Sequence, residues 1–421
     1  MSGYDVLVIG GGPAGLYAAY CLARAGRSVA VFEEHQEIGR PVHCTGLLAM
    51  EAFSRFTLPQ DSIQTTLRSA TFRSPGGKLL SVASDEDKTV VVDRQVFDRG
   101  LADQAVAAGA ELFLGHRIEE IFRLPGAVAA RTSIADYGGR LIRGRLAIVA
   151  TGAAYHLHRG LGLELPPRFV QTAQVEVDFT DEADVQLLFG NEVAPESFAW
   201  IVPFTRMGAP KAKIGLLSSG NAERYLASLL RSPLVASRVL PGLPCYYRRR
   251  PVPIRPIPKT FAERVLVIGD AAGLVKPTTG GGIYYSLLSA ELAAATATEA
   301  LTAGDYSARF LSRYQSTWQA ALASEIRIGG LFRGYASQLS DAQIDEAFDL
   351  VASEEVAQLI RDHAIFNWHS PIIRAFWRSS SLRRFVWRSL VARGRGLGAG
   401  GSRRSEVSRA LDRATEGVVT V

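Results

Sequence analysis

The N-terminal segment constrains the fold more than any other part of the chain. Tyr4–Ile9 is a continuous apolar run of strand length, which is typical of a buried parallel strand. Gly10, Gly12 and Gly15 follow it directly in the spacing GxGxxG, and a helical pattern of apolar residues comes next. Residues 28–32 then form a second apolar run. This order of strand, glycine-rich turn, helix and strand predicts a Rossmann-type unit that binds a dinucleotide.

Each glycine of the turn has a physical reason. Gly10 permits the tight turn, Gly12 lets the backbone approach a pyrophosphate, and Gly15 lets the helix pack closely on the strand. The helix N-terminus would offer unpaired N–H groups and its positive dipole to the phosphates. Glu33 ends the second strand and would accept hydrogen bonds from the ribose hydroxyls. The alternative is a glycine-rich turn that binds no nucleotide.

A second glycine-rich region lies far downstream. A strand at residues 264–268 enters a Gly-Asp pair that contains Asp270, and three further glycines open a long helix. We expect Asp270 to hydrogen-bond the ribityl hydroxyls of a flavin, the alternative being a plain helix N-cap. The amides of Gly281, Gly282 and Ile283 would stabilise negative charge on the reduced flavin. We therefore expect FAD to be the bound cofactor. Because no second strand–turn–helix unit with a GxGxxG motif is present for NAD(P), we expect the electron donor to visit transiently or to be a protein.

One dinucleotide fold built from both ends of the chain implies that substrate-binding segments are inserted between them. Ala173, Val175 and Val177 alternate in phase, as residues of a sheet strand do. We therefore expect an α/β fold: a discontinuous Rossmann-like FAD-binding domain, an inserted antiparallel β-sheet substrate domain and a C-terminal helical region. The expected boundaries are 1–60, 93–165 and 256–305 for the FAD-binding domain, 61–92 and 166–255 for the substrate domain, 306–393 for the helical region and 394–421 for a flexible basic tail.

Composition narrows the class of protein further. A chain of 421 residues that is 47% hydrophobic and 21% charged can bury a large core, which excludes wholesale disorder. Its longest apolar stretches carry glycine clusters or glutamates, so we expect no membrane-spanning helix, and we expect no secretory signal. Three cysteines offer neither a disulfide framework nor a metal site, and His156 and His158 are expected to be solvated. These features favour a cytoplasmic protein without a bound metal.

Positive charge is concentrated near the C-terminus. Residues 361–421 contain 12 arginines against four acidic residues, and aromatic residues such as Trp377 and Trp387 lie among them. Ser370 is expected to cap a helix there, and Gly394 is expected to end the last one. One interpretation is a pair of basic amphipathic helices that lie on an anionic membrane. The other is a helical hairpin packed on the body; nucleic-acid binding is not expected, because no recognised motif accompanies the charge.

Longer motifs around these glycines resemble a known family. They are residues 34–46 with their Pro41-Val-His-Cys-Thr-Gly run, residues 93–98, the Gly-Asp pair at 269–270 and the run Gly-Gly-Gly-Ile-Tyr-Tyr at 280–285. Over roughly residues 4–310 the chain is similar to the geranylgeranyl reductase family of p-hydroxybenzoate-hydroxylase-like flavoproteins. The resemblance implies an FAD-dependent oxidoreductase that reduces isolated C=C bonds of a prenyl lipid by hydride transfer from reduced flavin. Its electron donor would be NAD(P)H, ferredoxin or a quinol, and its basic helices could place it on the inner face of the cell membrane.

The resemblance also implies which residues contact the cofactor. Those at the family's FAD-binding positions are Ala14, Glu33, Cys44, Thr45, Leu47, Arg94, Asp270, Gly282 and Ile283. Ile118 would lie at the end of a short strand after Gly115 and touch the adenine through its backbone. The Arg94 guanidinium could pair bidentately with pyrophosphate oxygens. Its alternative is a surface ion pair with Asp98 or Asp93.

Two further sites concern the substrate. Phe198 and Trp200 resemble an aromatic stretch of the family that would wall an apolar slot for an isoprenoid, although Val202 replaces an aromatic residue there. Their alternative is ordinary sheet core. Cys44 is the candidate catalytic residue, because a protonated thiol could protonate the carbon that does not receive the hydride. Cys44 could instead only shape the loop over the flavin.

Two other functions fit the same motifs. The first is an FAD-dependent monooxygenase or halogenase on the same fold, for which Phe198-Ala-Trp200 is a partial match to a Trp-rich stretch. The second is a non-catalytic prenyl carrier on a flavoprotein scaffold. The run at residues 41–46 favours the reductase.

Overall fold

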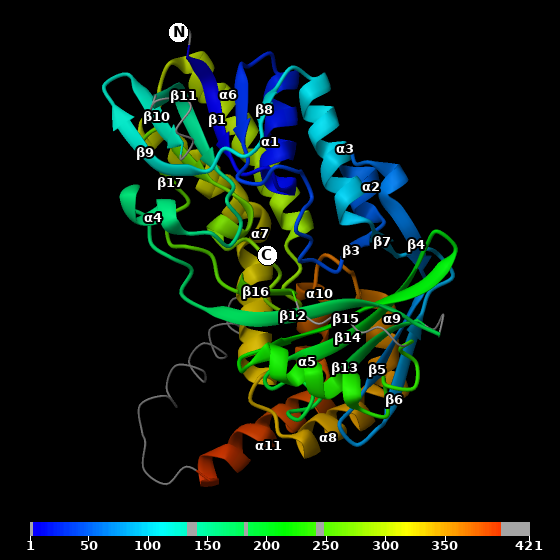
Figure 1. The fold of residues 1–421 in the computed structure, drawn as a ribbon. Helices are drawn as coiled ribbons and strands as arrows, with labels where there is room; N and C mark the ends of the chain where they lie inside the picture. Colours follow the sequence, from blue (N-terminus) through cyan, green and yellow to red (C-terminus); the bar gives the residue numbers. More distant parts are fainter. Residues whose placement is uncertain (1–2, 133–140, 181–183, 241–247, 397–421) are drawn as a thin grey trace.

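The computed structural model describes residues 3–132, 141–180, 184–240 and 248–396, and Figure 1 shows two sheets stacked along the long axis of the molecule. The upper sheet has the strand order β17-β18-β11-β1-β2-β8, with β9 and β10 paired beyond β11. Its strands β18, β11, β1, β2 and β8 run parallel. The strand bounds are β1 Tyr4–Ile9, β2 Val29–Phe32, β8 Glu111–Phe113, β9 Ile118–Leu124, β10 Ala127–Thr132, β11 Leu141–Val149, β17 Phe261–Ala262 and β18 Val265–Val267.

Helices cover this sheet and complete the Rossmann-like unit. Helix α1 packs against both α3 and α6, and α6 packs against α7. The close approach of α1 to β1 requires glycine at position 15, because a Cβ there would lie 2.0 Å from the carbonyl oxygen of Gly10. The helix bounds are α1 Pro13–Arg24, α3 Arg94–Ala107, α6 Ile283–Ala303 and α7 Ala308–Ala336.

The lower sheet has the strand order β16-β12-β15-β14-β13-β5-β6 and is antiparallel except for the parallel β13–β5 pair. Residues 61–92 divide between two sheets, since β4 and β7 belong to a separate three-stranded sheet in which β7 is central and pairs with both β3 and β4. Helix α5 packs on β12 and β15. The bounds are β3 Leu47–Ala49, β4 Ile63–Leu67, β5 Ser69–Arg73, β6 Leu79–Ala83, β7 Thr89–Val92, β12 Phe169–Asp178, β13 Val185–Phe189, β14 Phe198–Arg206, β15 Ala209–Ser218, β16 Arg248–Pro253 and α5 Ala222–Arg231.

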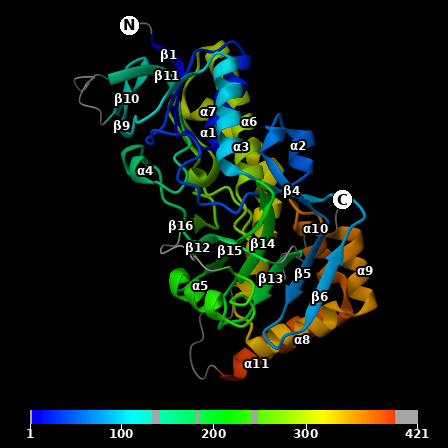
Figure 2. The same cartoon turned by 45° about the vertical axis from the view of Figure 1, so that its right-hand side comes forward.

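Four C-terminal helices lie beside the β5–β6 edge of the lower sheet (Figure 2). They are α8 Asp341–Val351, α9 Glu354–His363, α10 Ser370–Arg378 and α11 Ser380–Gly396. Ile373 and Ala375 of α10 and Phe385 of α11 are buried, as expected for helices packed on the body. Among the described helices, none is both long enough and apolar enough to span a membrane.

Two helix boundaries predicted in this region are wrong. Ser370 is the first residue of α10, and His369 occupies the N-cap position. Gly394 does not end α11, which continues to Gly396; a glycine inside a helix costs only about 1 kcal/mol. Most of the tail predicted at 394–421 lies outside the described residues.

The remaining short helices join these elements. Helix α2 follows β3, and α4 follows β11. The 3-10 helix η3 contains Asp270 and connects β18 to the glycine-rich stretch before α6. The bounds are α2 Glu51–Arg55, η1 Gln60–Ser62, α4 His156–Gly160 and η3 Gly269–Ala272.

Candidate active site

A large cavity lies where the two sheets meet. Its volume is about 1580 Å³, whereas pockets for small molecules are typically roughly 300–1,000 Å³. It therefore has room for a dinucleotide and a second molecule together. The cavity takes in the β1–α1 turn, the loop before β3, the glycine-rich stretch before α6 and one face of the lower sheet. Every predicted site residue lines it except Gly15, which is buried in the packing of α1.

The first glycine-rich turn has the geometry that a dinucleotide needs. Gly10 has a φ of 112°, a backbone conformation that favours glycine. A Cβ at Gly12 would meet nothing within 4 Å, so the backbone there borders open cavity. Glu33 lies at the end of β2, where its carboxylate accepts hydrogen bonds from the N–H groups of Gly11 (2.6 Å) and His35 (3.0 Å). These residues fit the pyrophosphate and ribose of a dinucleotide.

The second glycine-rich stretch brings Asp270 to the same cavity. Burial raises the pKa of the Asp270 carboxyl above its ordinary value. A Cβ at Gly282 would lie 2.7 Å from Asp270 Oδ1, so a larger residue there would displace this carboxylate. The N-cap alternative for Asp270 is wrong, because Ile268 and Gly282 occupy the N-cap positions of η3 and α6 and neither helix has a side-chain cap. Gly281, Gly282 and Ile283 lie at the start of α6, as predicted.

The loop that carries Cys44 is fixed from the lower sheet. Thr45 Oγ1 donates a hydrogen bond to Gln174 Oε1 (2.6 Å), and Cys44 Sγ accepts one from the N–H of Gly46 (3.3 Å). Lys213 Nζ donates to the carbonyl oxygens of Thr45 (2.8 Å) and Val92 (3.2 Å). Burial lowers the pKa of Lys213 to about 8. Sequence reasoning missed Lys213, although a lysine inside the apolar end of a strand was a usable signal.

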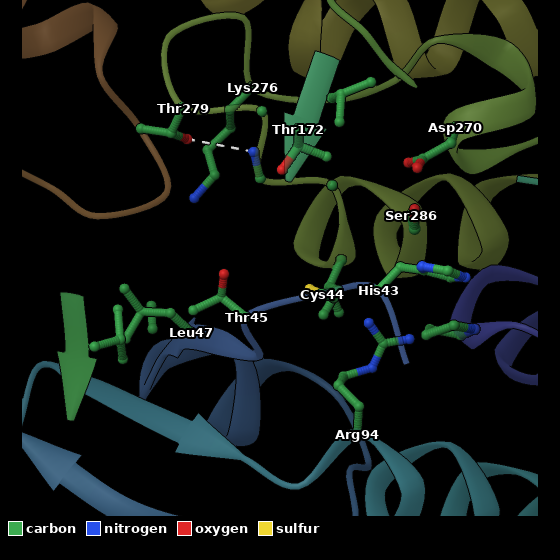
Figure 3. Close-up of a pocket in the computed structure, with 18 of the residues that line it drawn as sticks. His43, Cys44, Thr45, Leu47, Arg94, Thr172, Asp270, Lys276, Thr279 and Ser286 are labelled. Carbon is green, nitrogen blue, oxygen red and sulfur yellow. Dashed lines mark hydrogen bonds between the residues drawn. The ribbon is translucent and has the colours of Figure 1, made fainter. Parts of the chain in front are cut away.

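Arg94 forms an ion pair with Asp98, but this pair is buried and does not lie at the surface as its alternative interpretation expected. Its Nε and Nη2 donate to Asp98 Oδ1 (3.0 Å) and Oδ2 (2.8 Å). Burial opposes the charge, but Asp98 and Cys44 together hold the pKa of Arg94 above its ordinary value. Arg94 also lines the cavity beside Cys44 (Figure 3), so the ion pair and a phosphate contact are compatible.

Two predictions near β9 need correction. Ile118 does not end a strand but begins β9, and its carbonyl oxygen accepts a hydrogen bond from His156 Nε2 (2.8 Å). His158 is not solvated: it is fully buried in α4, and its Nε2 lies 2.8 Å from the carbonyl oxygen of Ala271. Burial lowers the pKa of His158. Three potential metal ligands do not come together anywhere in the described residues.

The far part of the cavity is apolar. Phe198 and Trp200 of β14 line it, with ring centroids 6.1 Å apart, and Trp200 Nε1 donates to Gln174 Oε1 (3.2 Å). Other apolar residues of the sheets contribute Leu67, Phe72, Val82, Leu187, Val202 and Leu217. The C-terminal region adds Ile360, Ala364, Ile365, Phe366 and Ile372. Sequence reasoning interpreted this region as membrane-lying helices or a packed hairpin and missed that it supplies part of the cavity wall.

Comparison with known proteins identifies the family. Residues 5–160 match the family model for FAD dependent oxidoreductases. The chain is 32% identical over 376 residues to the digeranylgeranylglycerophospholipid reductase of Methanoculleus marisnigri, covering 84% of this chain and 90% of the relative. The chain belongs to the geranylgeranyl reductase family.

Solved structures agree with this geranylgeranyl reductase fold. A geranylgeranyl bacteriochlorophyll reductase-like protein from Thermoplasma acidophilum superposes with a TM-score of 0.81 at 23% identity, covering 92% of this chain and 98% of its own. A p-nitrophenol 4-monooxygenase from Pseudomonas putida gives 0.68 at 20% identity, covering 87% and 98%. At these identities the likeness concerns the fold alone.

The predicted α/β fold class, the FAD cofactor and the assignment as an oxidoreductase are confirmed. This member of the family is an FAD-dependent oxidoreductase. Its cavity fits FAD, because the open backbone at Gly12, the Asp270 carboxylate and Gly282 lie on the same cavity.

Proposed function

We propose that this reductase saturates isolated C=C bonds in the isoprenoid chains of a prenyl lipid. One observation carries the proposal: a single cavity runs from the dinucleotide-binding turn to an apolar slot at Phe198 and Trp200. Bound FAD, once reduced, supplies the hydride. The relatives' name indicates a digeranylgeranylglycerophospholipid as the substrate class.

The residues that would hold FAD come from both ends of the chain. Gly12 and the N-terminus of α1 would face the pyrophosphate, with Arg94 Nη1 directed to its oxygens, and Glu33 would bind the ribose. Asp270 would accept hydrogen bonds from the ribityl hydroxyls. The remaining contacts in this proposal are Gly10, Ala14, Cys44, Thr45, Leu47, Ile118, Gly281, Gly282 and Ile283, with Gly15 supporting the turn.

The domain boundaries follow from the same proposal. The FAD-binding part would comprise 1–60, 93–165 and 256–305, and the substrate part 61–92 and 166–255. The C-terminal helices α9 and α10 line the apolar slot, so we propose that they bind substrate together with the substrate part. The electron donor would be NAD(P)H, ferredoxin or a quinol, because the sequence has one dinucleotide motif only.

A prenyl lipid must reach the cavity from a membrane. We propose that α11 rests on an anionic membrane surface at the inner face of the cell membrane. Trp387 is 70% exposed, and the arginines of α10 and α11 surround it in sequence. Deleting residues after Ser370 would remove this contact but also Ile372 of the cavity, so the substitution of Trp387, Arg383 and Arg384 by Ser, Gln and Gln is the sharper test. Reduced binding to phosphatidylglycerol vesicles with unchanged FAD content supports the contact; unchanged vesicle binding contradicts it.

The test of the reaction is anaerobic. The FAD-loaded protein is reduced with dithionite, mixed with a panel of prenyl lipids, and the products are analysed by mass spectrometry. A gain of two hydrogens per double bond, with stoichiometric reoxidation of the flavin, is expected. Flavin reoxidation that requires oxygen and depends on the substrate would instead indicate the monooxygenase or halogenase function.

A further inference from the structure

A buried cation lines the cavity close to the flavin-facing glycines. Lys276, in the segment between η3 and α6, is 5% exposed. Its backbone closes the glycine-rich stretch, since its N–H donates to the Gly281 carbonyl (3.1 Å) and its carbonyl accepts from the N–H of Gly280 (2.8 Å). A Cβ at Gly281 would lie 2.9 Å from Lys276 Cε and 3.5 Å from Nζ. The ammonium group therefore lies against the backbone that we assign to the flavin.

The C-terminal region holds this ammonium group with only two hydrogen bonds. Nζ donates to the carbonyl oxygen of Phe366 (3.2 Å) and to Asn367 Oδ1 (3.3 Å), and it lies 4.4 Å from the centroid of the Phe366 ring. Within the described part of the chain, no third acceptor binds it. Figure 3 shows its nitrogen directed toward the space that separates it from Thr45 and Leu47.

A network fixes the acceptors in turn. Asn367 Nδ2 donates to Glu51 Oε2 (3.1 Å), and the hydroxyl of Tyr285 donates to the carbonyl oxygen of Asn367 (3.2 Å). The charged or titratable groups that face Lys276 are Glu51 on α2, Glu325 on α7 and His369 before α10. Burial lowers the pKa of Lys276 to about 8, and the two glutamates oppose this shift. Lys276 and burial lower the pKa of His369 to about 4, so this histidine stays neutral.

We propose that Lys276 is the proton donor of the reduction. The inference rests on the proposed function. The Lys276 ammonium would give a proton to one carbon of the alkene, while the other carbon would receive the hydride, with its electron pair, that reduced FAD would supply. The C=C bond becomes a C–C bond with two new C–H bonds, the flavin is oxidised, and the neutral amine takes a proton from water to complete the cycle.

Lys276 suits this step better than Cys44 does. An ammonium group is a donor only, and an acid that titrates near the working pH transfers protons most effectively. Cys44 Sγ is already the acceptor of the Gly46 N–H and lies beside Arg94 (Figure 3). Cys44 then shapes the loop, and Lys276 supplies the proton.

Two variants of Lys276 separate a proton donor from a structural cation. K276R keeps a positive charge and hydrogen-bond donors, but a guanidinium does not release its proton near neutral pH. K276M removes charge and donors. K259M, which changes an exposed lysine, is the matched control. The rate of flavin reoxidation by a prenyl lipid is measured anaerobically in single turnover, together with the FAD dissociation constant of each variant.

A proton donor predicts a fall of about 10²- to 10⁴-fold in the reoxidation rate of both K276R and K276M, with an unchanged rate in K259M. FAD affinity in K276R should stay within a few-fold of wild type. In wild type the rate should decline as the pH rises through about 8, because the ammonium is lost there. A K276R rate equal to wild type, or a wild-type rate that is flat up to pH 10, would overturn the inference.

A second readout does not depend on turnover. The chain has six lysines, so ¹³C-lysine NMR can follow their Cε signals through a pH titration. The signal absent from K276R should titrate near pH 8, whereas a midpoint at the ordinary value of 10.5 would contradict the proposal. Failure of the proposed function is distinguishable, since reduced wild-type protein would then not be reoxidised by any prenyl lipid.

Discussion

Lys213 Nζ donates a 2.8 Å hydrogen bond to the carbonyl oxygen of Thr45, and this contact ties the lower sheet to the loop proposed to contact the flavin. The same nitrogen reaches the Val92 carbonyl at 3.2 Å and lies 4.9 Å from the centroid of the Phe204 ring. Lys213 is only 3% exposed. A buried cation therefore bridges the end of β7 and the loop before β3, two segments that come from different parts of the sequence.

The first prediction concerns the pH dependence of stability. The pKa of Lys213 is about 8 in the folded protein and has its ordinary value of 10.5 in the unfolded chain. Between these two pH values the unfolded chain therefore binds more protons than the folded protein does. Lys213 should therefore make the unfolding free energy rise with pH from about 8, as the burial of its charge is relieved, and its own contribution is about 3 kcal/mol at most. Urea unfolding at pH 7.5, 8.5 and 9.5 measures this rise.

K213M should remove the Lys213 contribution to the rise of the unfolding free energy with pH. The remaining rise comes from Lys276, whose pKa burial also lowers to about 8. At pH 7.5 the variant should also weaken FAD binding, since the carbonyls of Thr45 and Val92 lose their donor. A slope of stability against pH that is identical in wild type and K213M would contradict the burial of a charged lysine.

The second prediction uses the open backbone at Gly12. A Cβ there meets no protein atom within 4 Å, and the φ of −84° suits alanine, so G12A should fold with wild-type stability. The new methyl group would occupy the space proposed for the pyrophosphate. We expect the FAD dissociation constant to rise at least tenfold, which corresponds to about 1.4 kcal/mol. Flavin fluorescence titration measures the change.

G330A is the matched control for that experiment. Gly330 lies within α7, and a Cβ there also meets nothing within 4 Å. It should leave FAD affinity unchanged and increase stability by up to about 1 kcal/mol, as alanine does inside a helix. Equal FAD affinity in G12A and wild type would place the pyrophosphate elsewhere.

The third prediction concerns the buried pair of Arg94 and Asp98. Both side chains lie inside the protein and share two hydrogen bonds, so D98N leaves an uncompensated buried guanidinium. Breaking a buried pair in this way costs roughly 3–5 kcal/mol. D349N removes the partner of Lys78 in an exposed pair and should cost less than about 1 kcal/mol. Chemical denaturation of the FAD-free proteins compares the two variants, and equal losses would show that the Arg94 pair is not strongly coupled.

Local sequence patterns predicted those elements whose structure depends on neighbouring residues in the sequence. The turn at Gly10, the strand before it and the start of α6 at Ile283 depend on short-range geometry, and each lies where the pattern placed it. Lys213 and Lys276 could not be assigned in the same way. Their partners lie at Thr45 and Asn367, more than 90 residues away in sequence, and only the tertiary fold brings these groups together.

The error at His158 has the same origin. A His-x-His pair after a strand looks polar in sequence. The His158 ring is nevertheless buried, and it tolerates burial because the carbonyl oxygen of Ala271, 113 residues away in sequence, accepts its hydrogen bond. The helix end at Gly394 failed for a different reason. Glycine ends a helix where the chain must turn away, and α11 has no such turn before Gly396.

The fourth prediction separates substrate binding from cofactor binding at the aromatic wall. Phe198 lines the apolar part of the cavity, and its side chain makes no hydrogen bond to the residues that hold the Cys44 loop. The substitution F198L therefore removes only the aromatic ring. It should raise the KM for a prenyl lipid several-fold, leaving the FAD dissociation constant unchanged. W200F also removes the indole N–H that donates a hydrogen bond to Gln174 Oε1. The same oxygen accepts the hydrogen bond from the Thr45 hydroxyl. W200F should therefore raise the KM and weaken FAD binding as well, because Gln174 is less well fixed. Steady-state kinetics with flavin titration on both variants tests this difference, and an unchanged KM in both would assign the two rings to the sheet core alone.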